Sequence, residues 1–414
     1  MRKHFRLIPI LIGMSVFSAA YSQPLSLSAA IDIGLKNNPG IKAYTQKVNA
    51  SKGRFLSGVS LPQPELSVTN DYVPQGRNIH NFGEQSVGIS QSIEFPITYF
   101  FRGSKYSIER EIAENDLVIA KLGVIFNIKK SYFNVLARQE QMKIARENLV
   151  IAQDFVKKAE MRYSVGECTN LEKLTAKINY TEVLNAVEIR NNHLSIAIAE
   201  LNSAMGYGKN DSKIYFLTDE LSFVPLDLTP YRLLDISASV NPLLKADKLR
   251  VDSYSADKSI AWSSILPNFN LAYFNKQVSD DSKSFYGASI SIGIPIWFML
   301  DQSGKIQEAS SNLYAAKSDL QTTSNEVYAK TQAAFAEFKH AEKQVLLFIN
   351  DILPQAEEIC RTAAKSYEAG EITYMEYLQA QQTLTGSKGS CVDALLSYNL
   401  SIVTIEETIG KTLQ

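Results

Sequence analysis

The chain has 414 residues, of which 45% are hydrophobic and 21% are charged, and its formal net charge is −1. Because it is nearly neutral and contains no basic cluster, we do not expect it to bind nucleic acid. The length alone would fit two or three domains of ordinary size.

The first 22 residues have the pattern of a secretory signal peptide. A basic start is followed by an apolar run over residues 7–17 and then by small residues up to Ser22. We expect residues 1–22 to be removed by cleavage before Gln23. The apolar run is shorter than the roughly 20 residues of a membrane-crossing helix, although an N-terminal anchor is the alternative. No later segment is apolar enough for such a helix, so we expect a periplasmic, extracellular or outer-membrane protein.

The remaining sequence contains an internal duplication. The pentapeptide Tyr163–Glu167 returns as Tyr367–Glu371, at an offset of 204 positions. The pair Asn38-Pro39 returns as Asn241-Pro242 at nearly the same offset. The chain is therefore predicted to contain two copies of one structural unit.

We divide the chain into a first repeat at 23–207, a connecting segment at 208–228 and a second repeat at 229–414. Each repeat is predicted to begin with a helix, which in the first repeat is broken at Asn38-Pro39 because proline disfavours helix in the residue before it. A β-hairpin, a long helix and a return helix follow. They are expected at 64–95, 103–163 and 169–206 in the first repeat, and at 268–295, 304–368 and 373–410 in the second.

The two hairpins alternate apolar and polar residues with the period of a strand. In the first strand Leu66, Val68 and Tyr72 share one face, while polar residues such as Ser67 and Thr69 share the other. Strands of about 10 residues can cross an outer membrane at a tilt, although a soluble β-sandwich would also alternate.

Proline and aromatic residues follow each hairpin. We interpret the aromatic side chains as a membrane–water interface cluster, with packing at a strand end as the alternative. They are Tyr99, Phe100, Phe101, Trp297 and Phe298. Four strands cannot close a barrel, because open edges do not persist in lipid, so several chains must pool their hairpins.

The helical segments have lengths that fit one another. The helix at 103–163 would span about 90 Å, and the return helix and the helix before the hairpin would together span about the same length. We therefore expect the two shorter helices to stack end to end beside the long one. A soluble filamentous coiled coil would explain the helices, but not the strands or the duplication.

This arrangement resembles the TolC outer-membrane factor family across residues 23–414. The resemblance rests on the signal peptide, the two repeats and the Tyr-x-x-Gly-Glu turns, and the run Leu353–Glu358 is similar to the CzcC/CusC branch. It implies a mainly α fold with a transmembrane β-barrel: a homotrimer with four strands per chain in a shared 12-stranded barrel, and coiled-coil helices forming a periplasmic tunnel.

The implied function is the outer-membrane channel of a tripartite efflux or export system. Its partners would be a periplasmic adaptor protein, an inner-membrane pump of the RND type and outer-membrane lipid. A secreted structural coiled-coil protein that forms no channel is the alternative function.

The resemblance also implies a gate at the tunnel end far from the membrane. Its positions are Glu376, Gln379, Tyr367 and Glu172, with Gln379 standing where the family often has an aspartate. A family arginine is replaced here by Ile372, so the charged part of the gate departs from the family. The turns would contact the adaptor through Tyr163, Gly166, Glu167, Gly370 and Glu371.

No catalytic constellation accompanies these features. The sequence has four histidines without ligand spacing, three scattered cysteines, and no phosphate loop or nucleophile elbow. We therefore expect no enzyme activity, no metal site and no cofactor.

Overall fold

The structure is a computed structural model that describes residues 23–208, 215–278, 283–296 and 299–413. The expected signal peptide, Trp297 and Phe298 lie outside the described residues. Within the described ranges, no helix combines the length and the apolar character needed to cross a membrane.

The two halves of the chain follow the same order of elements. The first half contains β1 (Gln23–Leu25), α1 (Leu27–Asn37), α2 (Pro39–Val59), β2 (Glu65–Asp71), β3 (Glu84–Ile93), α3 (Pro96–Ser164) and α4 (Asn170–Ala204). The second half contains β4 (Tyr215–Leu217), α5 (Pro230–Val240), α6 (Pro242–Ser263), β5 (Asn268–Val278), β6 (Ser284–Gly293), α7 (Asp301–Leu347), a π-helical turn η1 (Phe348–Ile352), α8 (Leu353–Glu368) and α9 (Tyr374–Ile409).

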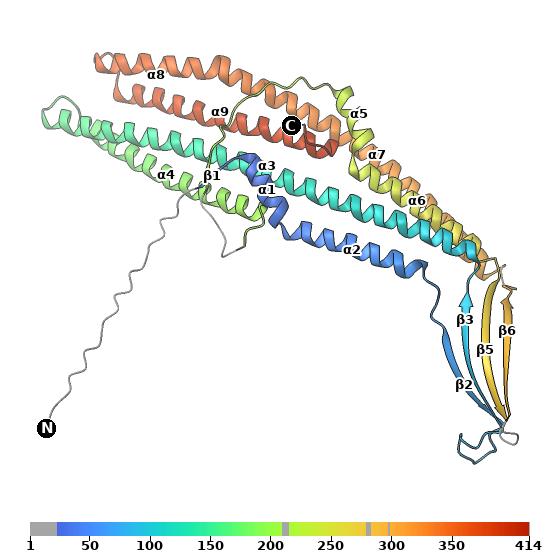
Figure 1. The fold of residues 1–414 in the computed structure, drawn as a ribbon. Coiled ribbons are helices and arrows are strands. Elements are labelled where there is room, and N and C mark those ends of the chain that lie inside the picture. The colour runs from blue at the N-terminus through green and yellow to red at the C-terminus, as the bar shows by residue number, and fades with distance from the viewer. Residues whose placement is uncertain (1–22, 209–214, 279–282, 297–298, 414) are drawn as a thin grey trace, which may run out of the picture.

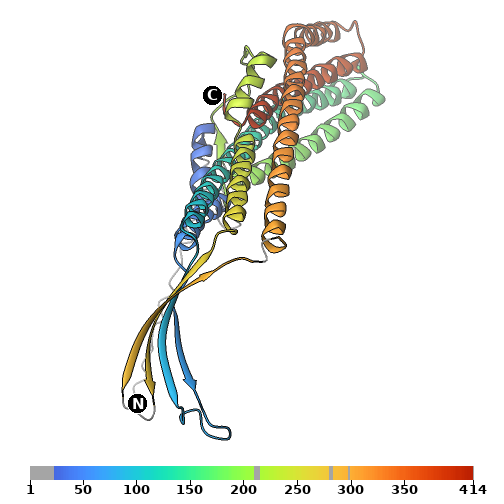
Figure 2. The same cartoon turned by 90° about the vertical axis from the view of Figure 1, so that its right-hand side faces the viewer.

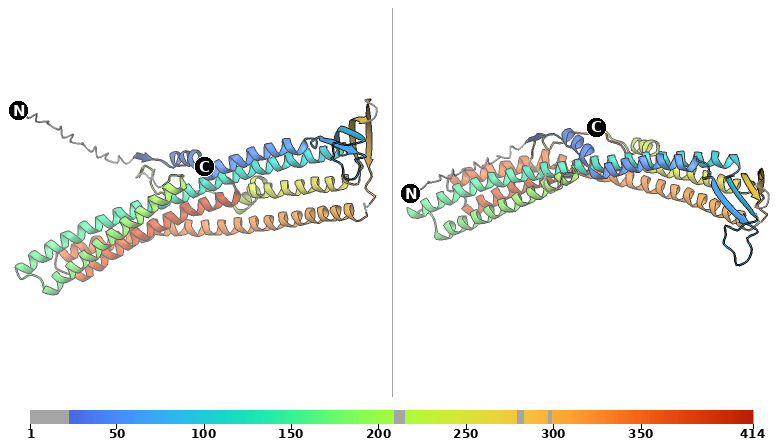
Figure 3. Two further views of the ribbon diagram at one scale, coloured as in Figure 1. Left: turned by 90° about the horizontal axis from the view of Figure 1, so that it is seen from below. Right: turned by 60° about the horizontal axis from the view of Figure 1, so that its bottom comes forward.

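The molecule is elongated, with its strands and its helical hairpins at opposite ends (Figures 1 and 2). Two hairpins, α3–α4 and α8–α9, end far from the strands. The short helices α1 and α5 lie near mid-length on one side of the long helices (Figure 3). We call this side the belt side, and it includes the small parallel pair β1–β4.

The hairpins combine into one antiparallel sheet in the order β2-β3-β5-β6. Its register places Leu66 opposite Ile89, Ile89 opposite Tyr273 and Leu271 opposite Ile290. Residues directly opposite one another share a face, so the sheet has one apolar face and one mainly polar face. The predicted alternation is therefore present in the sheet, and β2 and β6 form its two edges.

The long helices begin earlier than expected. Helix α3 starts at Pro96, not at residue 103, because proline is well suited to the first helical position, where its missing N–H is not needed. Consequently Tyr99, Phe100 and Phe101 lie in the first turns of a helix and not at the end of a strand.

The second long helix is continuous but irregular. The π-helical turn over Phe348–Ile352 comes immediately before Pro354, which occupies the first turn of α8. Proline cannot donate the usual hydrogen bond and crowds the preceding turn. The chain changes direction here, and α8 runs at a different slope from α7 (Figure 1).

The shorter helices meet end to end in both halves. Gly206, which follows α4, has φ +81, and a Cβ built on it would lie 2.8 Å from Asn38 Cα, where α2 begins. Gly410, which follows α9, has φ +71 and packs in the same way against Asn241 and Pro242. The Asn241 side chain also donates to Thr408 O over 2.8 Å. The expected end-to-end arrangement is therefore observed.

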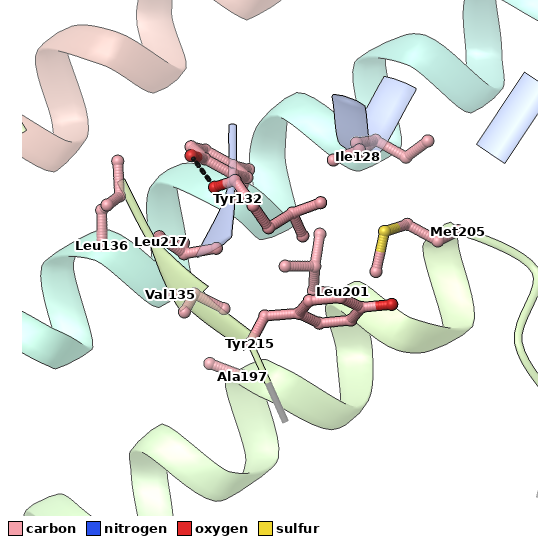
Figure 4. Close-up of a cluster of buried hydrophobic side chains, with 11 residues drawn as sticks. Ile128, Tyr132, Val135, Leu136, Ala197, Leu201, Met205, Tyr215 and Leu217 are labelled. Carbon is pink, nitrogen blue, oxygen red and sulfur yellow. Dashed lines mark hydrogen bonds between the residues drawn. The ribbon is translucent and has the colours of Figure 1, made fainter. Parts of the chain in front are cut away.

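Two similar apolar cores lie beneath the belt. The first joins α1, α3, α4, β1 and β4 around Tyr132, whose hydroxyl lies 2.9 Å from Leu25 O and 2.8 Å from Asp219 Oδ2 (Figure 4). The second joins α5, α7 and α9 around Phe338. No strand is predicted for the connecting segment from its sequence, whereas β4 lies there and pairs with β1.

One buried ion pair joins the halves. Lys129 Nζ on α3 lies 2.8 Å and 2.7 Å from the two carboxylate oxygens of Glu406 on α9. Glu406 is only 1% exposed and also accepts from the backbone N–H of Leu413. This bond fixes the end of the chain against α9.

Candidate functional site

The two turns at the far ends of the helical hairpins have the same geometry. Gly166 has φ +80 and Gly370 has φ +75, a conformation that favours glycine. In each turn the following glutamate donates its backbone N–H to the carbonyl five residues earlier, over 2.9 Å. Both glycines are surrounded by open space, so the turns are accessible.

Apolar side chains surround the first turn. Met161, Val165 and Leu171 are exposed by 69%, 65% and 75%. Tyr163 is partly covered by the Lys173 ammonium group, which lies 3.7 Å from its ring centroid. A cluster of exposed apolar residues at the end of a molecule is typical of a contact surface for another protein.

The structure brings together two of the four predicted gate residues. The Tyr367 hydroxyl on α8 donates to Glu172 Oε1 on α4 over 2.9 Å. These residues are 195 positions apart in the sequence. Burial, followed by the hydrogen bond to Glu172, raises the pKa of Tyr367 to about 12.

Arg162, which is not among the residues predicted from the sequence, completes this contact. Its Nη1 donates to the Tyr367 hydroxyl over 2.9 Å and lies 3.9 Å from Glu172 Oε1. Its guanidinium carbon also lies 5.6 Å from the centroid of the Tyr367 ring. The only sequence signal is a difference between the repeats, because Ser366 occupies the corresponding place before Gly370.

An aromatic cluster supports the triad of Arg162, Glu172 and Tyr367. The Phe155 ring lies 4.7–5.4 Å, centroid to centroid, from three tyrosines of the second repeat. They are Tyr367, Tyr374 and Tyr377. Offset and tilted aromatic pairs contribute energy beyond their buried area. The α3–α4 and α8–α9 hairpins are therefore held together by both stacking and polar contacts.

The other two predicted gate residues lie on the exposed side of α9. Glu376 and Gln379 are three positions apart, so they share one face of the helix. The Glu376 carboxylate accepts from the backbone N–H and the hydroxyl of Thr373, at 2.7 Å and 2.8 Å. Both hydrogen bonds lower the pKa of Glu376. Neither residue joins the triad.

The described members of the predicted interface cluster lie at the start of α3, directly after β3. The Tyr99 hydroxyl accepts from the backbone N–H of Glu94 over 3.2 Å, and Phe100 is 70% exposed. Phe101 packs edge-on against Phe100 at 6.0 Å between centroids. Arg102 pairs with Glu94 and lies over the Tyr99 ring.

Among the described residues, no group of three or more histidine, cysteine or acidic side chains could hold a metal ion.

Comparison with known proteins identifies the family. The outer membrane efflux protein family matches residues 30–207 and 233–411, once for each repeat. The cobalt-zinc-cadmium resistance protein CzcC of Cupriavidus metallidurans is 22% identical over 96% of this chain and 92% of its own length. The cation efflux system protein CusC of Escherichia coli is 23% identical over 92% of this chain and 85% of its own length.

The fold agrees with that assignment. The crystal structure of the CmeC outer membrane channel of Campylobacter jejuni superposes with a TM-score of 0.77 at 17% identity, covering 94% of this chain and 87% of that one. The family matches both repeats, and the fold is that of solved outer-membrane channels. This chain therefore belongs to the outer membrane efflux protein family.

Proposed function

We propose that three copies of this chain assemble into one outer-membrane channel. The proposal rests on the four-stranded sheet, whose outer strands β2 and β6 have unpaired edges. The apolar face is exposed as well, with Leu66 and Ile290 each 74% accessible. Unpaired edges are not tolerated in lipid, and spanning barrels have at least about eight strands. If the edge strands of three copies pair with one another, they form a shared 12-stranded barrel. This barrel has no unpaired edge and has more than eight strands.

The helices of the three copies then enclose a tunnel. The belt side faces outward, because α1, α5 and the β1–β4 pair cover it, and the opposite side lines the tunnel. The hairpin turns at its far end meet a periplasmic adaptor through Tyr163, Gly166, Glu167, Gly370, Glu371 and the exposed apolar residues around them. The adaptor connects the channel to an inner-membrane pump of the RND type.

The triad holds the far end closed. Arg162 and Glu172 belong to one hairpin and Tyr367 to the other, so separating the hairpins breaks every polar contact of the triad. Arg162 supplies the positive charge that the family places at the position of Ile372. Glu376 forms a carboxylate ring near the same end, beside Gln379, and such rings favour cations.

The names of two relatives, a cobalt-zinc-cadmium resistance protein and a cation efflux system protein, support metal cations as the exported cargo. No resident metal site is required, because a pore that binds its cargo tightly conducts it poorly.

Two neighbouring positions on β6 test the membrane arrangement. Ile290 lies on the apolar face and Ser289 on the opposite face. A lysine on the lipid face near the bilayer centre costs about 2–4 kcal/mol, whereas one facing the lumen is tolerated. Ile290→Lys should therefore deplete heat-resistant trimers from outer-membrane fractions, while Ser289→Lys should leave them intact and change conductance in planar bilayers. Equal tolerance of both changes would contradict the barrel.

A further inference from the structure

A buried glutamine lies on the side of α3 opposite to the belt. Gln141 follows Tyr132 by nine residues, which is about half a turn around the helix axis. Tyr132 points toward the belt, so Gln141 points away from it. The Gln141 side chain is nevertheless only 5% exposed, because side chains from three helices surround it.

Two arginines converge on its carbonyl oxygen. Arg138 Nη1 on α3 donates to Gln141 Oε1 over 2.8 Å, and Arg190 Nη1 on α4 lies 3.4 Å from the same atom. The two nitrogen atoms are therefore no more than about 6 Å apart. Like charges at this separation repel one another, most strongly when they are partly buried.

The arginines lack a direct counter-ion in the described part of the chain, where neither guanidinium lies within 4.0 Å of a carboxylate. Asp393 on α9 is the nearby acid, but it accepts from Gln141 Nε2 over 2.7 Å, on the other end of the amide. The neutral oxygen of Gln141 thus accepts hydrogen bonds from two cations, while the exposed Asp393 accepts from the amide nitrogen of Gln141.

The duplicated fold does not require the two arginines Arg138 and Arg190. The offset of 204 that relates the two Tyr-x-x-Gly-Glu turns relates Arg138 to Glu342 and Gln141 to Val345. The offset of the return helices relates Arg190 to Ala394, which packs in the second core. The second repeat therefore builds the equivalent region without either arginine.

We propose that Arg138 and Arg190 form an oxyanion-binding site, with Gln141 orienting both guanidinium groups. Guanidinium groups present planar forks of N–H donors that match phosphate and carboxylate oxygens. Each arginine uses one Nη1 contact on Gln141 and retains further donors. Both side chains are partly exposed, so an anion can reach them.

The position of this site in the tunnel rests on the proposed function, whereas the site itself lies within one chain. In the trimer three copies place six guanidinium groups on the inner wall, between the barrel and the tip. The tunnel would then contain an anion-attracting region in addition to the cation-attracting Glu376 ring.

Binding is tested with inorganic phosphate on the detergent-purified full chain. Phosphate should raise the thermal unfolding midpoint above that in chloride at equal ionic strength and pH 7. Arg138→Gln and Arg190→Gln should each weaken phosphate affinity by about tenfold or more, as expected for loss of a charge-assisted hydrogen bond. Arg146→Gln is the matched control, because it removes one positive charge from the belt side of the same helix.

The same proteins are compared in planar bilayers under a KCl gradient. The reversal potential should shift toward cation selectivity in Arg138→Gln and Arg190→Gln, and not in Arg146→Gln. If wild type gains no stability from phosphate, or if all three variants respond like wild type, the anion site is refuted. A wild-type protein that binds phosphate but conducts no current would refute the channel and leave the anion site standing.

Discussion

At the far end of the helical hairpins, the Arg162 side chain contacts both Tyr367 and Glu172. Its replacement by glutamine removes the cation but leaves the aromatic stacking around Phe155 in place. Arg162→Gln should therefore weaken closure without unfolding the tip, and single-channel conductance should rise several-fold. Lys157→Gln, an exposed change five residues earlier on the same helix, should leave conductance unchanged. If both variants conduct like wild type, Arg162 does not hold the channel closed.

The Tyr367 hydroxyl should give the proposed closure a pH dependence. Tyr367 must be protonated to donate to Glu172, and its folded-state pKa of about 12 exceeds the ordinary tyrosine pKa of 10.0. Because the pKa is raised in the folded state, the hydrogen bond stabilises the closed end fully at pH values below the unfolded-state pKa. This stabilisation is lost as the pH rises through the folded-state pKa. Closed channels should remain closed up to about pH 10 and open between about pH 10 and 12. Tyr367→Phe channels should conduct more at neutral pH and show no such transition.

Glu376 combines a capping role with the proposed charge ring. Three carboxylates held close together would raise one another's pKa, whereas the hydrogen bonds from Thr373 lower it. These bonds therefore help to keep the ring charged. Because glutamine can replace glutamate in a capping box, Glu376→Gln removes the charge and keeps the cap.

Planar-bilayer recordings separate the two roles. Glu376→Gln should reduce cation selectivity and weaken block by divalent ions added from the periplasmic side, while Glu376→Ala should also destabilise the start of α9. Since Gln379 is neutral, block in wild type should be weaker than in relatives that carry two acidic rings. An unchanged blocking constant in Glu376→Gln would return Glu376 to a purely structural role.

Among the helices, the junction between α9 and α6 depends on one glycine. Gly410 has φ +71, and a Cβ added there would overlap Pro242 Cδ. Gly410→Ala should destabilise the protein by about 1–3 kcal/mol, because it combines backbone strain with a clash. Gly386→Ala is the control within α9, because nothing lies within 4 Å of its added Cβ. That change should stabilise the helix by about 1 kcal/mol. Opposite shifts in the thermal unfolding midpoint would support the junction, and equal shifts would contradict it.

The buried pair of Lys129 and Glu406 joins the two halves at mid-length. Removing one partner of a buried ion pair leaves an uncompensated charge, which is more costly than losing the attraction itself. The pair also links α9 to the end of the chain through Leu413. The second repeat is thus anchored to α3 of the first by chemistry that the duplication does not repeat.

For the whole molecule, the proposed orientation places the loop between β2 and β3 outside the cell and the hairpin turns in the periplasm. Gly76 lies in that loop, with φ +82 and no atom within 4 Å of an added Cβ. An epitope inserted at Gly76 should bind antibody on intact cells. The same epitope at Gly166, an equally open glycine at the opposite end, should be detected only after the outer membrane is breached. The reverse pattern would show that the orientation is wrong.

Much of this fold is encoded locally, which is why the sequence predicted it. The alternation in β2 and β3 depends on residues two apart, and each Tyr-x-x-Gly-Glu turn on a single left-handed glycine. The break at Asn38-Pro39 follows from a steric restriction between neighbours. The repeat of these signals about 204 positions later determined the two-unit architecture, and the unequal helix lengths determined the end-to-end stacking.

The features that only the tertiary structure decided involve contacts between distant segments. The β1–β4 pair joins residues on either side of the first repeat, and three-residue strands leave no periodic signal. Arg162 meets Tyr367 across 205 positions, and Gln141 gathers Arg190 and Asp393 from two other helices. A polar residue on a long helix has the same local pattern whether it is solvated or paired. Its partner is therefore determined by how the helices pack and not by the residues beside it in the sequence.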